Sequence, residues 1–291
     1  MDQRRGSPLS SDCTVIRELR PAERLLFEGE TTCIGSFACD AHDPRFYSES
    51  PSTAHCIVFS RTPVWIRHEQ GRRYVADPTV VTFHNRGRVY QRWKIADEGD
   101  HCDWFAYSDA VVRDAIGDAA TVRGPLWFPR EFAPVASSVY ARQRRLVDRI
   151  RTGIADRMAI EEEAALLLDD VLTTTSTRAW PREFDAVQHV RALIAASPCT
   201  ARSLHALAAP VDMTPFQLCR AFRRVSGETM TSYRLRLRLL SSLERVRAGD
   251  AITDVALAHG FSSHSHYTAA FRAEFGTPPT HARELRTWNQ P

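Results

Sequence analysis

Two stretches of this sequence share one plan: Leu207-Ala-Ala-Pro-Val-Asp-Met-Thr-Pro-Phe-Gln-Leu-Cys-Arg-Ala-Phe222 and Val255-Ala-Leu-Ala-His-Gly-Phe-Ser-Ser-His-Ser-His-Tyr-Thr-Ala-Ala-Phe271. In each, an apolar helix runs into a tight turn at Asp212 or Gly260, and a hydroxyl residue then caps a second helix. This is the arrangement of a helix-turn-helix unit, whose second helix enters the major groove of DNA with its first residues facing the base edges. The sequence therefore predicts two such units.

Further helices are predicted around and between the two units. Thr214 is predicted to cap the second helix of the first unit, with Pro215 at the first helical position. Ser262 is expected to cap the second helix of the second unit. A long connecting helix is expected from about Thr231 to Ala248, ahead of Gly249. The following side chains recur at helical spacing and are expected to face the core: Phe184, Val187, Val190, Ile194, Leu204, Leu207, Leu218, Phe222, Tyr233, Leu237, Leu240, Leu243, Ile252, Val255, Ala256, Phe261, Tyr267, Phe271 and Pro279.

The match extends beyond the general motif to a set of longer runs. These are Arg220-Ala-Phe-Arg-Arg-Val-Ser-Gly227, Tyr233-Arg-Leu-Arg-Leu-Arg238, Ile252-Thr-Asp-Val-Ala256, Gly260-Phe-Ser-Ser-His-Ser-His-Tyr267 and Phe271-Arg-Ala-Glu-Phe-Gly-Thr-Pro-Pro279, with Arg283. With these spacings, residues 185–285 closely resemble the C-terminal domain of AraC/XylS-family regulators. The resemblance implies a seven-helix domain, double-stranded DNA as the partner, and RNA polymerase as a second partner.

The resemblance also implies which residues touch DNA. The recognition helices, at about 214–224 and 262–273, would enter successive major grooves, about 34 Å apart, with the connecting helix as spacer. Carried over by position, the DNA-binding residues are Phe216, Gln217, Cys219, Arg220, Arg223 and Arg224 of the first helix and His264, Ser265, His266, Thr268 and Arg272 of the second. Ala269 also faces the groove, where the family often has a longer polar residue.

Several of these side chains have alternative interpretations. Arg220 suits the two acceptors of a guanine edge, or it bonds a phosphate or a neighbouring acid. Phe216 meets a thymine methyl or simply packs. Five further arginines are expected to contact phosphates or acids rather than bases, which adds affinity without specificity: Arg223, Arg224, Arg234, Arg236 and Arg238.

The N-terminal part has a different pattern. From about residue 22 to 108, short apolar runs are separated by turn-forming residues, which predicts antiparallel strands. After Pro129 the apolar period becomes helical, which predicts amphipathic helices at 137–154 and 158–172. Four threonines, a serine and a proline within residues 172–181 indicate a linker.

The predicted organisation is two domains. The pattern predicts that residues 1–130 form a mainly β domain, a small barrel or sandwich, and that residues 131–172 form a helical hairpin. The family resemblance implies that the β domain is cupin-like and regulatory and that the hairpin supplies a homodimer contact; the alternative is that the hairpin packs on its own barrel. Residues 173–181 are the linker, and residues 182–291 form the all-α DNA-binding domain with two helix-turn-helix units.

Charge and composition agree with this division. The chain of 291 residues has a net charge of +3, but residues 181–291 carry 14 arginines against 9 acidic residues, so the excess of positive charge is C-terminal. No apolar run is long enough to span a membrane and the N-terminus lacks a signal-peptide pattern, so we expect a cytoplasmic protein. The seven cysteines include no C-x-x-C pair. We therefore expect mostly reduced thiols, no metal and no cofactor.

The β-rich domain resembles the sensor domain of many family members, partly through Val75-Ala-Asp-Pro78, which implies a small-molecule effector. Its aromatic residues suit a pocket wall or the core. A metal-dependent cupin enzyme needs an H-x-H motif, and none occurs before residue 180, so we expect no catalytic residues. The alternatives left open are that enzyme, a metal or oxidant sensor built from the N-terminal cysteines and histidines, and an architectural DNA-binding protein without an effector.

Overall fold

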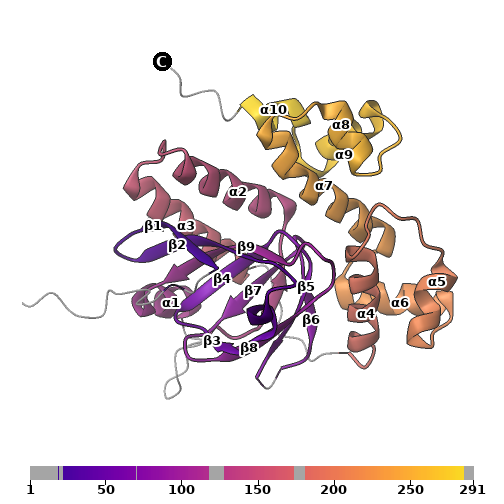
Figure 1. The fold of residues 1–291 in the computed structure, drawn as a ribbon, viewed down its shortest axis with the longest axis horizontal. Coiled ribbons are helices and arrows are strands. Elements are labelled where there is room, and N and C mark those ends of the chain that lie inside the picture. The colour runs from indigo at the N-terminus through magenta and orange to yellow at the C-terminus, as the bar shows by residue number, and fades with distance from the viewer. Residues whose placement is uncertain (1–18, 20–21, 70, 118–127, 174–180, 285–291) are drawn as a thin grey trace, which may run out of the picture.

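The computed structural model describes residues 19, 22–69, 71–117, 128–173 and 181–284. Its N-terminal part is mainly β and continues into helices, and residues 184–284 are helical (Figure 1). The predicted fold class is therefore confirmed. Residues 174–180, which make up most of the predicted linker, and Cys13 lie outside the described residues.

The strands form two antiparallel sheets. They are β1 (Glu23–Glu28), β2 (Thr32–Cys39), β3 (Ser50–Pro51), β4 (His55–Ser60), β5 (Val64–His68), β6 (Tyr74–Ala76), β7 (Val80–His84), β8 (Val89–Lys94), β9 (Asp100–Tyr107) and β10 (Phe132–Pro134). One sheet has six strands in the order β1-β2-β9-β4-β7-β10, and the other has four in the order β3-β8-β5-β6. Successive strands β6 and β7 therefore belong to different sheets.

The six-stranded sheet is buried on one face by helices. Across four of its strands, Ile34, Phe105, Ile57 and Phe83 are aligned in register, and none is more than 1% exposed. They belong to one apolar cluster with buried residues of α1 (Asp109–Ile116), α2 (Ser137–Arg151) and α3 (Arg157–Thr173). The apolar stripes of α2 and α3 thus pack on their own sheet, which was one of our two alternatives.

Side chains alternate between the two faces of a sheet along each strand. The opposite face of the six-stranded sheet packs against the four-stranded sheet. Phe37, Trp104 and Ala106 of one sheet share a buried cluster with Val64 and Ile66 of the other. The indole ring of Trp104 lies directly over its cross-strand neighbour Gly35, where a Cβ atom would come within 2.1 Å of the ring. Glycine at this position therefore lets the two sheets close over the ring.

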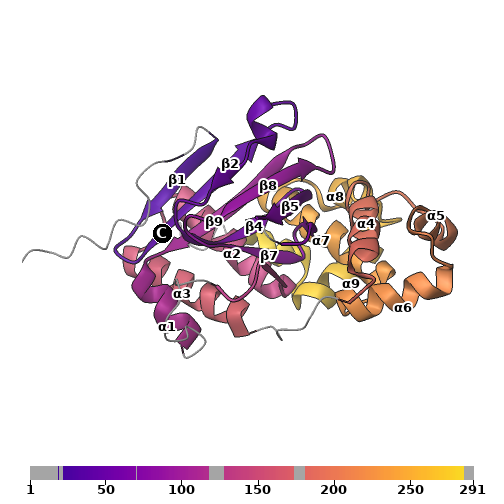
Figure 2. The ribbon, with the colours of Figure 1, turned by 90° about the horizontal axis from the view of Figure 1, so that it is seen from below.

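Seven α-helices follow within residues 184–284. They are α4 (Phe184–Ala195), α5 (Leu204–Ala208), α6 (Pro215–Ser226), α7 (Met230–Ala248), α8 (Ile252–Ala258), α9 (His264–Phe275) and α10 (Pro279–Glu284), with a short 3-10 turn after α5. Figure 2 shows α4 to α9 gathered at one end of the molecule, beside the strands. The side chains predicted to face the core are buried, with one exception.

The exception is Leu204, which is 46% exposed. It is the first residue of the five-residue helix α5, directly after the cap Ser203. A side chain at this position points back beyond the start of the helix rather than onto the core. Its placement inward was therefore wrong, whereas Leu207, one turn later, is buried.

The cap of the second reading helix was also misplaced by one residue. Ser263, not Ser262, has extended backbone and accepts a hydrogen bond from the N–H of His266 at 3.1 Å. The Ser262 hydroxyl instead lies 3.2 Å from the His266 ring. Ser262 lies in a bend between buried Phe261 and this cap, so α9 begins at His264.

Two elements of the N-terminal part differ from the predicted ones. Residues 132–134, which we assigned to the helical hairpin, form β10 and pair with β7. Residues 109–116, within the region expected to be β-rich, form α1, capped by Ser108. In addition, α2 ends at Arg151, so Ile154 lies beyond it and is 44% exposed.

Adjacent leucines of α3 test how this helix packs. Leu167 is fully buried and Leu166 is 52% exposed. We expect Leu167→Ala to lower the free energy of unfolding by about 2–5 kcal/mol, because it leaves a cavity against the sheet. Leu166→Ala should change it by less than about 0.5 kcal/mol. Urea unfolding followed by tryptophan fluorescence measures both, and equal losses would contradict this packing.

The two serines before α9 test the position of the cap. Ser263→Ala removes the acceptor for a helix N–H group and should lower the free energy of unfolding by about 1 kcal/mol. Ser262→Ala leaves that acceptor in place and serves as the matched control. Chemical denaturation of both variants and of the parent protein measures these free energies of unfolding. A larger loss of stability for Ser262→Ala than for Ser263→Ala would show that Ser262 is the cap.

Candidate nucleic-acid interface

The first helix-turn-helix unit consists of α5, a turn and α6. Asp212 ends the turn in the left-handed backbone region, with φ of 51°. Thr214 then forms a capping box with Gln217: the Thr214 hydroxyl accepts from the Gln217 N–H, and the Gln217 side-chain oxygen accepts from the Thr214 N–H at 2.9 Å. Buried Leu218 and Phe222 fix the inner face of α6. The helix is thereby held in one orientation.

The outer face of α6 carries all the residues predicted to contact DNA in this unit. Phe216 is 69% exposed, and its ring lies 5.7 Å from the Arg220 guanidinium. Cys219 and Arg223 are also exposed. Phe216 and Arg220 thus lie next to each other on the exposed face of α6.

Two residues of this face are engaged within the protein. The oxygen of Gln217 belongs to the capping box, and a bidentate contact with adenine uses both the oxygen and the nitrogen of the amide. Arg224 donates to Glu183 and forms an ion pair with it. Recognition of bases by Gln217 and of phosphates by Arg224 would therefore compete with these contacts.

The second unit consists of α8, the turn at Gly260 and α9. Gly260 has φ of +71°, and Tyr267 and Phe271 pin α9 from inside. Five of the residues predicted to face DNA are exposed on the outer face of α9: His264, Ser265, His266, Ala269 and Arg272. Thr268 differs, because it is half-buried and its hydroxyl oxygen has no hydrogen-bond partner among the residues described.

The arginines of α7 are used inside the protein. Arg234 donates to the carbonyl oxygens of Pro198 and Cys199, at 2.7 and 3.1 Å. Arg238 donates to the carbonyl oxygen of His259 at 2.6 Å and stacks on Phe261.

Arg236 pairs with Glu228 and donates to the carbonyl oxygen of Val135 in the N-terminal part at 3.5 Å. Arg236 thus bonds an acid, one of the two predicted kinds of partner, whereas Arg234 and Arg238 bond backbone carbonyls, which we did not predict.

A cavity lies between the two sheets of the N-terminal part. Its empty space, including the part open to solvent, is about 680 Å³. Its wall is largely apolar and its polar groups include Glu23, Thr82, His84, Tyr90 and Asp100. Burial raises the pKa of Asp100, and the Arg92 guanidinium, 3.6 Å away, acts in the opposite direction. An apolar wall with a few polar groups is typical of a small-molecule site.

The aromatic residues noted in the sequence divide between surface, core and cavity. Trp104 lines the cavity, whereas Phe83 and Phe105 lie in the core on the other side of the sheet. Trp65 and Trp93 are half-buried on the outer side of the four-stranded sheet, where the Arg73 guanidinium lies 4.3 and 4.8 Å from their rings. Within the described ranges, no three His, Cys, Asp or Glu side chains come together as metal ligands.

Two polar anchors, each built on a fully buried aspartate, are among the contacts that join the two parts of the chain. In the first, Asp77 of the β6–β7 turn is fully buried and accepts from Arg191 of α4 at 2.9 Å and from the hydroxyl of Tyr233 of α7 at 2.6 Å. Gln188 of α4 accepts from the N–H of Val75 at 2.9 Å. Burial alone would lower the pKa of Arg191, but the charge of Asp77 raises it above its ordinary value.

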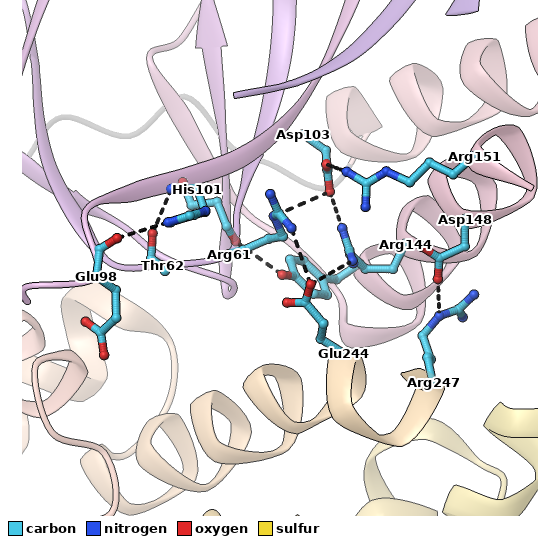
Figure 3. A network of polar contacts seen from close by, with 12 residues as sticks. Arg61, Thr62, Glu98, His101, Asp103, Arg144, Asp148, Arg151, Glu244 and Arg247 are labelled. Atoms are coloured by element: carbon cyan, nitrogen blue, oxygen red, sulfur yellow. Dashed lines mark hydrogen bonds and ion pairs between the residues drawn. The ribbon is translucent and has the colours of Figure 1, made fainter. Parts of the chain in front are cut away.

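The second anchor joins α2 and the six-stranded sheet to α7 (Figure 3). Asp103 of β9 is fully buried and bonds Arg144 of α2, whose second nitrogen lies 3.9 Å from Glu244 of α7. Farther along α7, Arg247 donates to Asp148 of α2 at 2.6 Å. Each helix-turn-helix unit is thus adjacent to its own anchor.

Asp77, Gln188 and Arg191 were not singled out from the sequence as functional residues. A signal was present, since Gln188 and Arg191 are polar residues next to the inward Val187 and Val190 of α4. Buried polar side chains on an inward face require partners. The family-like run Val75-Ala-Asp-Pro78 supplies them.

Comparison with known proteins finds similarity in the helical part. Residues 207–285 match the family model described as a helix-turn-helix domain. A protein of Proteus vulgaris described as the probable transcription factor PqrA is 36% identical over 73 residues, which are 25% of this chain and 60% of that protein. The chain thus matches less than two thirds of the length of this curated relative.

Among solved structures, wild-type ToxT of Vibrio cholerae with a bound unsaturated fatty acid is 10% identical, with 88% of this chain and 95% of that chain covered and a TM-score of 0.36. A transcriptional regulator of Chromobacterium violaceum described as AraC-type is 26% identical, with 36% and 96% covered and a TM-score of 0.34. Residues 207–285 are thus similar in sequence to a helix-turn-helix domain, as the motifs predicted.

Proposed function

We propose that this protein is a sequence-specific DNA-binding transcriptional regulator whose activity is controlled by a small effector. One observation carries the proposal: two capped helices, α6 and α9, are pinned from inside by aromatic residues and present exposed polar side chains in a domain that matches a helix-turn-helix family model. A helix held in this way can enter a major groove without rearrangement. The excess of arginine in this part supports attraction to phosphates.

Effector control is supported by the cavity between the two sheets. Its wall includes both apolar and polar groups, and Ala76 in that wall directly precedes Asp77, which bonds the DNA-binding part. The first anchor is therefore one residue from the place where a ligand would sit. We propose that the N-terminal part acts by binding this ligand rather than by catalysis.

The remaining partners are proposals that follow from the family resemblance. A regulator of this kind acts on RNA polymerase in the compartment that holds the chromosome, the cytoplasm. Ile154 and Met158 are exposed apolar side chains in the turn before α3 and in its first turn, and we expect a second copy of the chain to pack there. None of the helices in the described ranges is long and apolar enough to cross a membrane.

The proposal is tested by selecting bound sequences from random duplex DNA with the full-length protein at about 0.15 M salt. Enrichment of two sequence blocks about one helical turn apart supports the regulator. Binding without any enriched sequence, for the full chain and for residues 181–291 alike, would contradict it and favour an architectural protein. Bound metal with turnover of a substrate would favour the enzyme.

Arg220→Ala and Arg223→Ala form a matched pair on α6. We expect Arg220→Ala to relax the selected sequence at one base position, with a loss of about 1–3 kcal/mol of discrimination there. Arg223→Ala should weaken binding to all sequences about equally and reduce the salt dependence by about one phosphate contact. Titrations of selected and scrambled duplexes at several salt concentrations measure both. Arg220 is not a base-reading residue if the two variants behave alike.

A further inference from the structure

The turn between β6 and β7 closes one side of the cavity. β6 belongs to the four-stranded sheet and β7 to the six-stranded sheet, so this turn crosses from one sheet to the other. Ala76 before the turn and Thr82 after it both line the cavity. A ligand that pushes the two sheets apart must therefore change the geometry of the turn.

The same turn is bonded to α4 and α7, the two helices that pack against the first helix-turn-helix unit. Asp77 accepts from the N–H and the hydroxyl of Thr79, at 2.8 and 2.6 Å, which makes the turn rigid. Its other carboxylate oxygen accepts from Arg191 and Tyr233, and Arg191 also donates to the Thr79 hydroxyl at 2.9 Å. Asp77 and Tyr233 are fully buried and Arg191 is 6% exposed, so water cannot readily replace these bonds.

From this anchor, packed side chains lead to the first reading helix. The Tyr233 ring lies 5.6 Å from the ring of Phe222, which pins α6 from inside. Arg191 stands on α4, and Val187 and Val190 of that helix share a buried cluster with Leu218 and Phe222 of α6. Movement of the turn would therefore displace α4 and α6 together.

The second unit is attached elsewhere. Arg247, near the end of α7, bonds Asp148 of α2, and Glu274 of α9 accepts from the Ser137 hydroxyl of α2 at 2.5 Å (Figure 3 shows the first of these). The buried residues of α2 pack with the outer face of the six-stranded sheet, and none of the residues that line the cavity comes from α2. Tyr267 and Phe271 of α9 share this buried cluster with α2 and the sheet, so the second unit is held through α2 and the outer face of the sheet and not through the β6–β7 turn.

We propose that Asp77 is a positioning residue that transmits occupancy of the cavity to the first helix-turn-helix unit, while α2 holds the second unit in place. An effector would thus change the position of α6 relative to α9, and with it the fit to two successive grooves. This inference rests on the proposed function, because it takes the cavity as the effector site.

The test uses hydrogen exchange of the full chain, with an engineered side chain in place of the unidentified ligand. Val58→Phe adds an aromatic ring to the cavity wall, and Ala106→Phe does the same from the neighbouring strand if the first variant fails to fold. We expect either wedge to change amide exchange several-fold in α4 and α6 and to leave α8 and α9 unchanged.

Asp77→Asn and Asp148→Asn are matched replacements at the two anchors. In an Asp77→Asn background the wedge should no longer alter exchange in α4 and α6, whereas in an Asp148→Asn background the full effect should remain. If Asp77→Asn does not fold, Tyr233→Phe removes one bond to Asp77 and keeps the ring, and it should reduce the wedge effect.

Three outcomes would overturn the inference: a wedge effect of equal size without Asp77, an effect shared equally by both units, or no change in α4 and α6. Hydrogen exchange is measured on the protein without DNA, so its outcome does not depend on whether the protein binds DNA. Sequence-selective DNA binding together with an Asp77-independent wedge effect would leave the regulator in place and remove only the coupling. If no DNA sequence is selected but the wedge effect still depends on Asp77, the regulator proposal is contradicted and the coupling through Asp77 remains.

Discussion

A carboxylate excluded from water determines how the two parts of this protein meet. Asp77 lies in a turn of the β-rich part, and among the described residues its charge is balanced by an arginine of the helical part. Removing one member of such a buried pair costs about 3–5 kcal/mol, because the other charge is left uncompensated. The bond therefore fixes α4 against β6 and requires the first helix-turn-helix unit to follow the turn. The surrounding arrangement of cavity, turn and reading helix depends on this constraint.

The second buried carboxylate, Asp103, plays the corresponding part on the other side of the six-stranded sheet. It holds α2 through Arg144, and α2 in turn contacts α7 and α9. The two reading helices are thus carried by one connecting helix, α7, but are held from separate places. Such a division gives a regulator a means of changing the relative position of its two reading helices without unfolding either.

Much of the fold was predictable because local patterns agreed with the packing. Apolar runs between turn-forming residues marked the strands, and Thr214-Pro215 and Gly249 marked helix ends that the structure confirms at these residues. The errors arose where tertiary contacts override local signals. β10 is three residues long and is defined by its pairing with β7. Ser262 and Ser263 are equivalent cap candidates in the sequence, and only the folded structure, in which Phe261 is buried, makes Ser263 the cap.

The candidate interface was predictable from position, but the engagement of its residues was not. Nothing in the sequence shows that the Gln217 oxygen is used by the helix cap or that Arg236 reaches Val135, more than a hundred residues earlier. The bond between Asp77 and Arg191 is of the same kind, since it joins residues 114 positions apart. Long-range polar pairs leave no periodic signal in a sequence.

A hydroxyl-radical footprint on a selected duplex measures whether α6 and α9 bind two successive major grooves. We expect two protected blocks on one face of the DNA, about 10 base pairs apart between centres, with the protection of one block altered by Arg220→Ala. A single protected block, or uniform protection along the duplex, would contradict this expectation.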